Sequence, residues 1–257
     1  MSITRREFLG AAAAGAALVQ PAARHRPASR VRAVAFDAFA LFDPAAVTAA
    51  ATAAFPDIAP RLLDVWRRRQ FEYTWLRVAS GRYADFWKVT HDALEFAVNA
   101  TGVDLKGATR DDLMNAHLRL DAWADAMPVL DALKQSGVRL AMLSNFTSAM
   151  LDANLRRTGL AGSFEHSIST DRARTYKPAP RAYRLGVEAF GLKPDEILFV
   201  ASAGWDAAGA ALFGYPTFWA NRAAAPVEQL DARPGASGRS LEPLPAIVTG
   251  RAANHAG

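Results

Sequence analysis

Apolar residues are distributed along this chain in two patterns, one typical of buried strands and the other typical of helices. The first buried strand is predicted at Val31–Asp37, an apolar run that ends in an acid. After residue 127, strand-like and helix-like segments alternate. The expected strands are Val138–Leu143, a short one near Glu165–Ile168, Glu196–Val200 and Thr217–Ala220. The expected helices are Pro128–Ser136, Thr147–Thr158, Pro180–Phe190 and Trp205–Leu212.

Between these two regions, from about residue 48 to residue 120, apolar positions recur at helical spacing only. Long amphipathic stretches cover Leu62–Val78 and Tyr83–Thr101. A Thr-x-x-Asp signal predicts that a further helix begins at Thr109. We therefore expect this block to be an all-helical insertion.

The alternation of strands and helices predicts an α/β fold with a Rossmann-like parallel sheet that helices cover on both faces. Residues 31–45 and 121–250 are expected to form this core domain, and residues 46–120 a helical cap subdomain inserted into it. The tail from Ala223 is rich in Ala, Gly and Pro. We expect it to add little to the core beyond Leu241–Val248.

Polar side chains follow three of the predicted strands. Asp37 closes the first strand, Ser144 and Asn145 follow Val138–Leu143, and Ser202 and Asp206 follow Glu196–Val200. Taken singly, each serine would be interpreted as a turn former or a helix cap. Ligands of parallel sheets bind outside the carboxyl ends of the strands. The convergence of these side chains therefore favours a site with Asp37 at its centre.

The composition is that of a globular protein, with 51% hydrophobic and 21% charged residues in a chain of 257. A formal net charge of +5 raises the question of a nucleic-acid partner. However, the densest basic cluster, Arg67–Arg69, lies in a helical stretch with Glu72 and has no interleaved aromatic pattern. A solvated helix face is the favoured interpretation. We expect no nucleic-acid partner, and a charge balance that suits small anions.

The chain has no cysteine, which excludes disulfides, thiolate catalysis and zinc sites built on Cys. Its five histidines do not stand at a metal-ligand spacing, so no metal site is predicted. They are His25, His91, His117, His166 and His255.

The N-terminus has the three parts of an export signal in order. Thr4–Gly10 resembles the twin-arginine motif, Ala11–Val19 is an apolar run too short for a stable membrane anchor, and Pro21–Ala23 supplies small residues. We expect residues 1–30 to be a twin-arginine signal peptide, cleaved near Ala23, followed by a flexible linker. This predicts the twin-arginine translocase as a partner and a periplasmic or secreted location.

Several motifs resemble the haloacid dehalogenase superfamily, in the order in which that superfamily carries them. They are Phe36–Asp43, Leu143–Asn145, Tyr176–Pro178 and Val200–Asp206. The helical block also carries segments that look like the cap of the type II (S)-2-haloacid dehalogenases, namely Trp66–Arg77 and Gly81–Tyr83. The resemblance covers about residues 31–222. It implies hydrolysis of small-molecule (S)-2-haloacids to (R)-2-hydroxyacids, with a homodimer among the possible assemblies.

The resemblance also implies roles for three catalytic residues. Asp37 would attack C2 of the substrate and form an ester, which water hydrolyses at the Asp37 carbonyl. Lys177 would lie beside Asp37 and keep it ionised. Asp206 would pair with Lys177 and help to position the water.

A substrate pocket is implied in the same way. Arg67 would reach from the cap toward the halide or the carboxylate, since its fork of donors suits both. Asn145 and Trp205 would complete the halide pocket, and Ser144 would hold the carboxylate. The remaining pocket residues implied by the resemblance and by the strand ends are Ser202, Tyr183, Phe39 and Trp75.

Phe39 argues against the chemistry of the superfamily's phosphatases. Those enzymes place a second Asp two residues after the nucleophile, as a general acid, and bind Mg²⁺ with the acids around it; here that position is Phe39. A halide leaves without a proton, so dehalogenation needs neither group. We expect no metal and no cofactor, and a phosphatase is the less favoured alternative.

The chain departs from the family pattern at two places. Asp37–Asp43 is one residue shorter than the usual Asp-x-Tyr-Gly-Thr-Leu-Phe-Asp and lacks its Gly and Thr. Ala203 stands where the family has an Asn that orients Lys177 and the water. Each lost polar group would cost on the order of 10²-fold in rate. A second hypothesis is therefore a degenerate homologue that binds small carboxylates with little or no turnover.

Overall fold

The computed structural model of the protein describes residues 31–250, so the predicted export signal lies outside the described residues. A parallel sheet of six strands forms its centre, in the order β5-β4-β1-β6-β7-β8. The strands are β1 (Ala33–Phe36), β4 (Arg139–Ser144), β5 (His166–Ser169), β6 (Ile197–Ala201), β7 (Thr217–Ala220) and β8 (Ala236–Gly238). The predicted α/β fold with a parallel sheet is confirmed.

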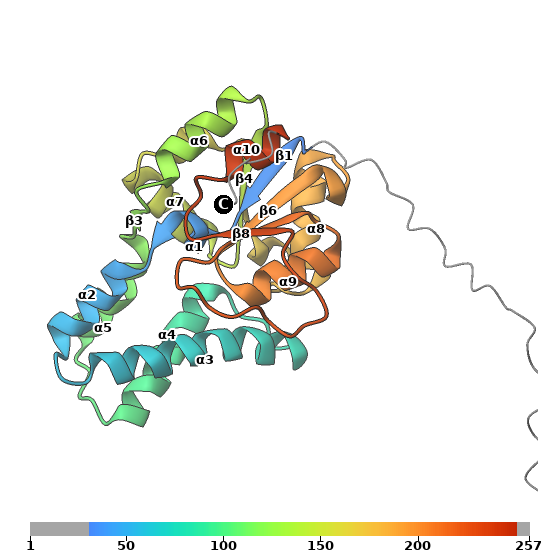
Figure 1. Ribbon diagram of the computed structural model, residues 1–257. Coiled ribbons are helices and arrows are strands. Elements are labelled where there is room, and N and C mark those ends of the chain that lie inside the picture. Colours follow the sequence, from blue (N-terminus) through green and yellow to red (C-terminus); the bar gives the residue numbers. More distant parts are fainter. Residues whose placement is uncertain (1–30, 251–257) are drawn as a thin grey trace, which may run out of the picture.

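The sheet is buried on both faces, because successive side chains of its strands enter two different hydrophobic clusters. In β1, Val34 and Phe36 belong to one cluster, while Ala33 and Ala35 belong to the other. Figure 1 shows α6 and α7 on one side of the sheet and α8 and α9 on the other. The core helices are α6 (Ala126–Gln135), α7 (Ser148–Arg157), α8 (Pro180–Phe190), α9 (Gly204–Phe213) and α10 (Leu244–Thr249). Short 3₁₀ turns connect them: η2 (Ala161–Ser163), η3 (Thr170–Ala173) and η4 (Pro194–Glu196).

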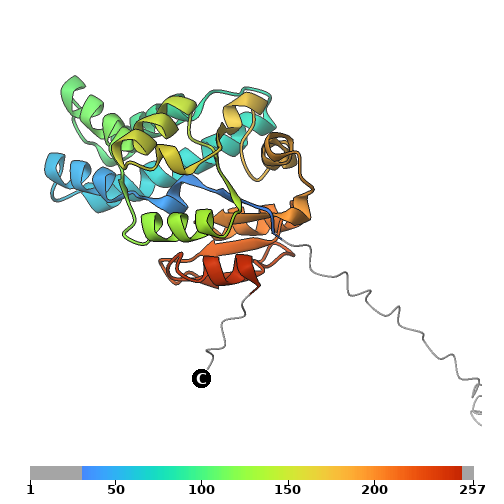
Figure 2. The same ribbon diagram turned by 90° about the horizontal axis from the view of Figure 1, so that it is seen from above.

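The segment between the two strands of a small ribbon is entirely helical. It comprises α2 (Ala45–Ala54), α3 (Ala59–Ala79), α4 (Phe86–Thr101), α5 (Gly107–Asn115) and η1 (Ala116–Leu118). We call residues 45–118 the helical insertion. It forms a layer of its own beside the sheet (Figure 1), and the end that carries α2 and α5 projects beyond the core (Figure 2).

The two long helices of the insertion are joined by buried polar contacts as well as by apolar packing. Trp66 of α3 donates its indole N–H to the backbone oxygen of Thr90 on α4, over 2.8 Å. Gln70, one turn later, donates to the Thr90 hydroxyl over 2.7 Å. These contacts fix the face that α3 turns toward α4. Arg67 and Phe71 each follow one of the two donors by one residue.

Two details of the insertion differ from the prediction. The helix expected to begin at Thr109 begins at Gly107, and Lys106 is its extended N-cap residue, without a side-chain cap. Thr109 is already the third helical residue, so its hydroxyl is too late in the helix to cap it. The insertion is also closed by an antiparallel ribbon that the pattern did not predict, formed by β2 (Phe42–Asp43) and β3 (Asp121–Ala122). Strands of two residues are too short to show a periodicity.

The tail contributes more than was predicted. Leu241, Leu244 and Val248 are buried, as expected. In addition, β8 pairs with β7 as the edge strand of the sheet. Its sequence, Ala-Ser-Gly, has neither β-branched nor aromatic residues and so gives no strand signal.

The backbone turns sharply directly after β1. Asp37 is the N-cap residue of the one-turn helix α1 (Ala38–Leu41), and its carboxylate accepts a hydrogen bond from the backbone N–H of Phe39. None of residues 38–42 has a positive φ angle. The shortened segment therefore makes its turn with ordinary backbone conformations and does not require the missing glycine.

Candidate active site

The Asp37 carboxylate lies at the carboxyl end of β1 and is surrounded by donors. Its Oδ2 accepts from the backbone N–H of Phe39 and from the Ser202 hydroxyl, each over 3.0 Å. Its Oδ1 accepts from Nζ of Lys177 over 2.8 Å and has a long contact of 3.5 Å with the Ser144 hydroxyl. These partners come from α1, from the last residue of β4, from the residue after β6 and from the loop that carries Lys177. The structure thus brings together residues that the strand ends and the resemblance predicted.

Lys177 lies beneath Asp37, with only 1% of its surface exposed. Its ammonium group bridges two carboxylates, with 2.8 Å to Oδ1 of Asp37 and 2.5 Å to Oδ2 of Asp206. It also lies 4.9 Å from the centre of the Phe199 ring. Burial lowers the pKa of Lys177, but attraction to Asp206 and Asp37 outweighs burial and the pKa is raised. The ammonium therefore stays charged, and it is oriented without the family's asparagine.

Asp206 is fixed from behind by Tyr183. The Tyr183 hydroxyl donates to Oδ1 of Asp206 over 2.7 Å. Burial raises the pKa of Asp206 to about 6, although Lys177 opposes the shift. The pKa of Tyr183 is raised because its hydroxyl is buried and lies next to Asp206. Tyr183 was predicted to contact substrate, which is wrong for this arrangement: it is fully buried and lies behind Asp206.

Asn145 and Trp205 offer N–H groups that no described residue uses. The side-chain oxygen of Asn145 accepts from the backbone N–H of Lys177 over 3.0 Å and from the Thr170 hydroxyl over 3.2 Å. Its amide NH₂ therefore points the other way, toward the space beside Asp37. Trp205 stands in the first turn of α9, at the same space. Both could donate to an anion there.

The space beside Asp37 is small and has two different sides. Its volume is about 20 Å³, enough for about one water molecule. Its polar side is formed by Asp37, Ser144, Asn145, Ser202, Ala203 and Asp206. Its aromatic side is formed by Phe39, Phe71, Phe86, Phe146 and Trp205. We call this space the Asp37 cavity. A carboxylate, an adjacent aromatic wall and free N–H donors suit nucleophilic displacement on a small anionic molecule.

Arg67 does not line the Asp37 cavity, contrary to the prediction. Its guanidinium group donates to the Thr48 hydroxyl of α2 over 2.9 Å. It lines a separate open groove of about 420 Å³ with Thr48, Pro60, Leu63, Asp64, Arg68 and Phe71. Phe71, one helical turn after Arg67, lines both spaces and separates them. The resemblance indicates which position of the helix carries the arginine, and it does not indicate the partner that a long side chain selects.

Trp75 was also predicted to line the pocket, and it does not. Its indole N–H donates to the backbone oxygen of Lys177 over 3.3 Å. Its ring packs edge-on against Trp205, with 5.5 Å between ring centres. Tyr176 makes a second such contact, donating its hydroxyl to the backbone oxygen of Ala84 over 2.6 Å. Both residues therefore join the helical insertion to the core next to the site.

Three aromatic lining residues were missed in the sequence: Phe71, Phe86 and Phe146. Phe146 directly follows Asn145 and Phe71 follows Arg67 by one helical turn, so proximity to residues already selected was the available signal. On their own, aromatic residues in buried helices and after buried strands indicate core packing.

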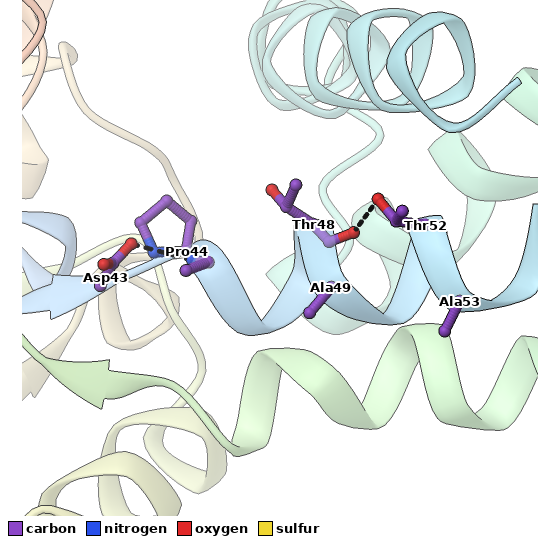
Figure 3. Close-up of a pocket in the computed structure, with 7 residues that line it drawn as sticks. Asp43, Pro44, Thr48, Ala49, Thr52 and Ala53 are labelled. Carbon is purple, nitrogen blue, oxygen red and sulfur yellow. Dashed lines mark hydrogen bonds between the residues drawn. The ribbon is translucent and has the colours of Figure 1, made fainter. Parts of the chain in front are cut away.

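A larger hollow lies along α2 and lacks the features of a reactive site. It has a volume of about 740 Å³ and is lined by Asp43, Pro44, Ala45, Thr48, Ala49, Thr52 and Ala53 (Figure 3). Its charged residue, Asp43, already caps α2 by accepting from the backbone N–H of Ala45 over 2.9 Å. Figure 3 shows the Thr52 hydroxyl turned to the backbone oxygen of Thr48, 2.9 Å away.

Residues 31–250 contain no cluster of three His, Asp or Glu side chains placed to hold a metal ion. Within the same residues, no helix combines the length and the apolar character needed to cross a bilayer.

Comparison with known proteins identifies the class to which this fold and site belong. A family model described as haloacid dehalogenase-like hydrolase matches residues 31–214. The (S)-2-haloacid dehalogenase of Pseudomonas sp. (strain YL) is 40% identical over 205 residues, which are 79% of this chain and 88% of the relative. The chain therefore belongs to the haloacid dehalogenase superfamily and, within it, to the (S)-2-haloacid dehalogenase family.

Solved structures agree with this assignment. The L-2-haloacid dehalogenase RSc1362 has a TM-score of 0.84 and 40% identity, over 86% of this chain and all of that chain. The L-2-haloacid dehalogenase of Xanthobacter autotrophicus with chloropropionic acid covalently bound has a TM-score of 0.79 and 34% identity, with the same coverage. These relatives are dehalogenases. The two alternative hypotheses, a phosphatase and a homologue that binds small carboxylates without turnover, are therefore not favoured.

Proposed function

We propose that this protein hydrolyses (S)-2-haloacids to (R)-2-hydroxyacids through an ester on Asp37. The observation that carries the proposal is the Asp37 carboxylate, which faces a cavity with free N–H donors and is held by Lys177, Ser202 and the Phe39 N–H. The family assignment supports it, since a relative bears a covalently bound haloacid.

In the first step, an oxygen of Asp37 attacks C2 from the side opposite the halogen. A C–O bond forms, the C–halogen bond breaks, and the halide leaves with the bonding electron pair. The amide of Asn145 and the indole N–H of Trp205 are the free donors that can stabilise the departing anion. Because C2 is inverted once, an (S)-acid gives an (R)-product.

In the second step, water attacks the carboxyl carbon of Asp37. The bond between that carbon and the ester oxygen on C2 breaks, so an oxygen that came from Asp37 leaves with the product as an alkoxide and takes up a proton. Asp37 keeps one oxygen from water. Asp206 is the carboxylate nearest to Lys177 and lines the same cavity, so it can accept the water's proton. Its pKa of about 6 suits a base that works near neutral pH.

Halide release by the purified chain tests this proposal. Incubation with bromoacetate and (S)-2-chloropropionate should release halide, and an Asp37→Asn variant should release none. After one turnover in ¹⁸O-water, mass spectrometry of the peptide with Asp37 should show one heavy oxygen. Halide release at the same rate by Asp37→Asn, or a heavy oxygen in the product alone, would contradict the ester mechanism.

We also propose that the protein is exported by the twin-arginine translocase and that it forms a homodimer. Support for export is the order of the Arg pair, the apolar run and the small residues in 1–23. Support for the dimer is the family resemblance. Cell fractionation should find the protein in the periplasm and an Arg5→Lys, Arg6→Lys variant in the cytoplasm, while an Arg24→Lys control is exported. Light scattering that gives a monomer mass would refute the dimer.

A further inference from the structure

Phe146 forms the part of the Asp37 cavity wall that belongs to the core. Its ring is enclosed by two others, edge-on to Phe39 with 5.1 Å between centres and stacked on Phe86 with 5.6 Å. Phe146 and Phe86 are each 1% exposed. A ring held in this way has no free volume behind it into which it could move.

The backbone of Phe146 is held as well. Its N–H donates to the Ser144 hydroxyl over 3.2 Å, and its carbonyl accepts from the Ser169 hydroxyl over 2.6 Å. Ser144 and Ser169 end the neighbouring strands β4 and β5. The ring is therefore anchored through its backbone to the ends of two neighbouring strands of the sheet.

The lining of the cavity determines where the parts of a substrate can lie. A 2-haloacid has a carboxylate, a halogen and a substituent on C2. The carboxylate and the halide need donors, and those without a short bond to Asp37 are the Ser144 hydroxyl, the Asn145 amide and the Trp205 indole. The C2 substituent is thus directed at the phenylalanine wall. In a haloacetate this substituent is a hydrogen atom, and in longer acids it is an alkyl group.

We propose that Phe146, backed by Phe39 and Phe86, makes this enzyme select haloacetates over longer (S)-2-haloacids. This inference rests on the proposed function and adds its substrate class. The Asp37 cavity, at about 20 Å³, is smaller than any haloacid, so its aromatic wall has to give way for every substrate and further for each added methyl group. Phe146 is the ring of that wall whose backbone is anchored to the ends of two strands. Misfit of one methylene at an apolar wall changes kcat/KM about 10- to 200-fold. We expect a preference of that size for bromoacetate over (S)-2-bromopropionate.

The test compares kcat/KM for bromoacetate, (S)-2-bromopropionate and (S)-2-bromobutyrate. Phe146→Leu should reduce the preference for bromoacetate at least tenfold by raising kcat/KM for the longer acids. Phe190→Leu is the matched control, because Phe190 is a buried ring at the far end of α8 and does not line the cavity. It should leave the preference unchanged. If Phe146→Leu does not fold, Phe71→Leu opens the same cavity from α3 and should act in the same direction.

The outcomes separate this inference from the proposed function. Similar kcat/KM values for the three acids in the unchanged chain would overturn the selection and leave the proposed function standing. A preference that neither Phe146→Leu nor Phe71→Leu alters would also overturn it. Halide from none of the acids, and no Asp37 adduct by intact mass, would overturn the proposed function and the inference with it. If an adduct forms without turnover, its rates of formation with the three acids measure the selection directly.

Discussion

Ser202 donates its hydroxyl to Oδ2 of Asp37 over 3.0 Å, beside the N–H of Phe39 at the same distance. This oxygen therefore has two donors although the segment after β1 lacks the family's threonine. The structure thus offsets one of the two departures that weakened the prediction of turnover. Ser202 is thus the side-chain donor that holds Oδ2 of Asp37, as Lys177 holds Oδ1.

We predict that Ser202→Ala lowers kcat for halide release about 10- to 100-fold. A hydrogen bond to a charged group is worth about 1.5–3 kcal/mol, and the variant leaves Oδ2 of Asp37 with one donor. Steady-state halide release measures the effect. Ser167→Ala is a suitable control, because Ser167 is an exposed residue of β5. An unchanged kcat in Ser202→Ala would show that the Phe39 N–H alone positions the carboxylate.

Removal of the Lys177 ammonium should destabilise the protein, and more strongly at high pH. Lys177→Met leaves Asp37 and Asp206 buried with no counter-charge, and breaking a buried pair costs about 3–5 kcal/mol. Without the ammonium, the folded-state pKa of Asp206, which burial already raises, rises further above the unfolded value. Uptake of a proton by Asp206 relieves the repulsion, so the loss in melting temperature should shrink as pH falls from 8 to 5.

The double variant Lys177→Met, Asp206→Asn is the control for that prediction. It removes one of the two carboxylates and should recover much of the lost stability at pH 8. A loss in melting temperature that is the same at pH 5 and pH 8 would show that packing, and not charge, dominates at this position.

The raised pKa of Asp206 leads to a prediction about how activity depends on pH. Burial raises its pKa to about 6, so above this pH it is ionised and holds Lys177, and below it the carboxyl takes up a proton. We expect kcat/KM for halide release to fall as pH decreases through about 6. Asp206→Asn should have low activity without this acidic limb. A flat profile between pH 5 and 8 in the unchanged protein would contradict the assignment.

The centre of the site was predictable because its position follows from the sheet. Asp37, Ser144 and Ser202 all come directly after apolar runs, and parallel strands place such residues at one edge. Lys177 lies in a loop, so only its resemblance to a family motif selected it. Asp206 was selected both by its place after Glu196–Val200 and by a family motif. The contacts of Lys177 with both carboxylates could be recognised only in the three-dimensional structure.

The wall and the entrance of the site were not predictable in the same way. Phe71 and Phe146 have the same chemistry as core residues, and only the shape of the cavity distinguishes them. Arg67 lies on a helix, as predicted, but the Thr48 hydroxyl determines where its guanidinium group lies. Long, exposed side chains have many rotamers of similar energy, and sequence spacing does not choose among them.

The contact between Arg67 and Thr48 leads to a further prediction. If Arg67 binds the substrate anion as the resemblance implies, it has to leave Thr48 first. Thr48→Val, which keeps the shape and removes the hydroxyl, should then raise kcat/KM by a few-fold, since an exposed hydrogen bond is worth about 1 kcal/mol. Arg67→Gln should lower kcat/KM about 100-fold or more. If both variants have the same kcat/KM as the unchanged protein, Arg67 has no role in binding the substrate.

His117 gives a prediction about stability in acid. It lies in η1, where the helical insertion returns to the core, and its ring packs edge-on against Trp66 with 5.1 Å between centres. Burial lowers the pKa of His117 from 6.5 to about 4, although backbone hydrogen bonds with Leu113 and Met114 oppose the shift.

Because the folded-state pKa is lower than the unfolded one, the unfolded chain takes up a proton first as pH falls. The stability contributed by neutral His117 is fully present above pH 6.5 and is lost as pH decreases toward 4, by about 3 kcal/mol. Asp206 acts in the opposite direction over part of this range, so only a comparison of variants isolates His117. His117→Leu should flatten the fall in melting temperature between pH 6.5 and 4.5, whatever its effect at pH 7.5. His91→Leu, at a half-exposed histidine of α4, should keep the slope of the unchanged protein. If His117→Leu keeps that slope as well, the ring is protonated in the folded state without cost.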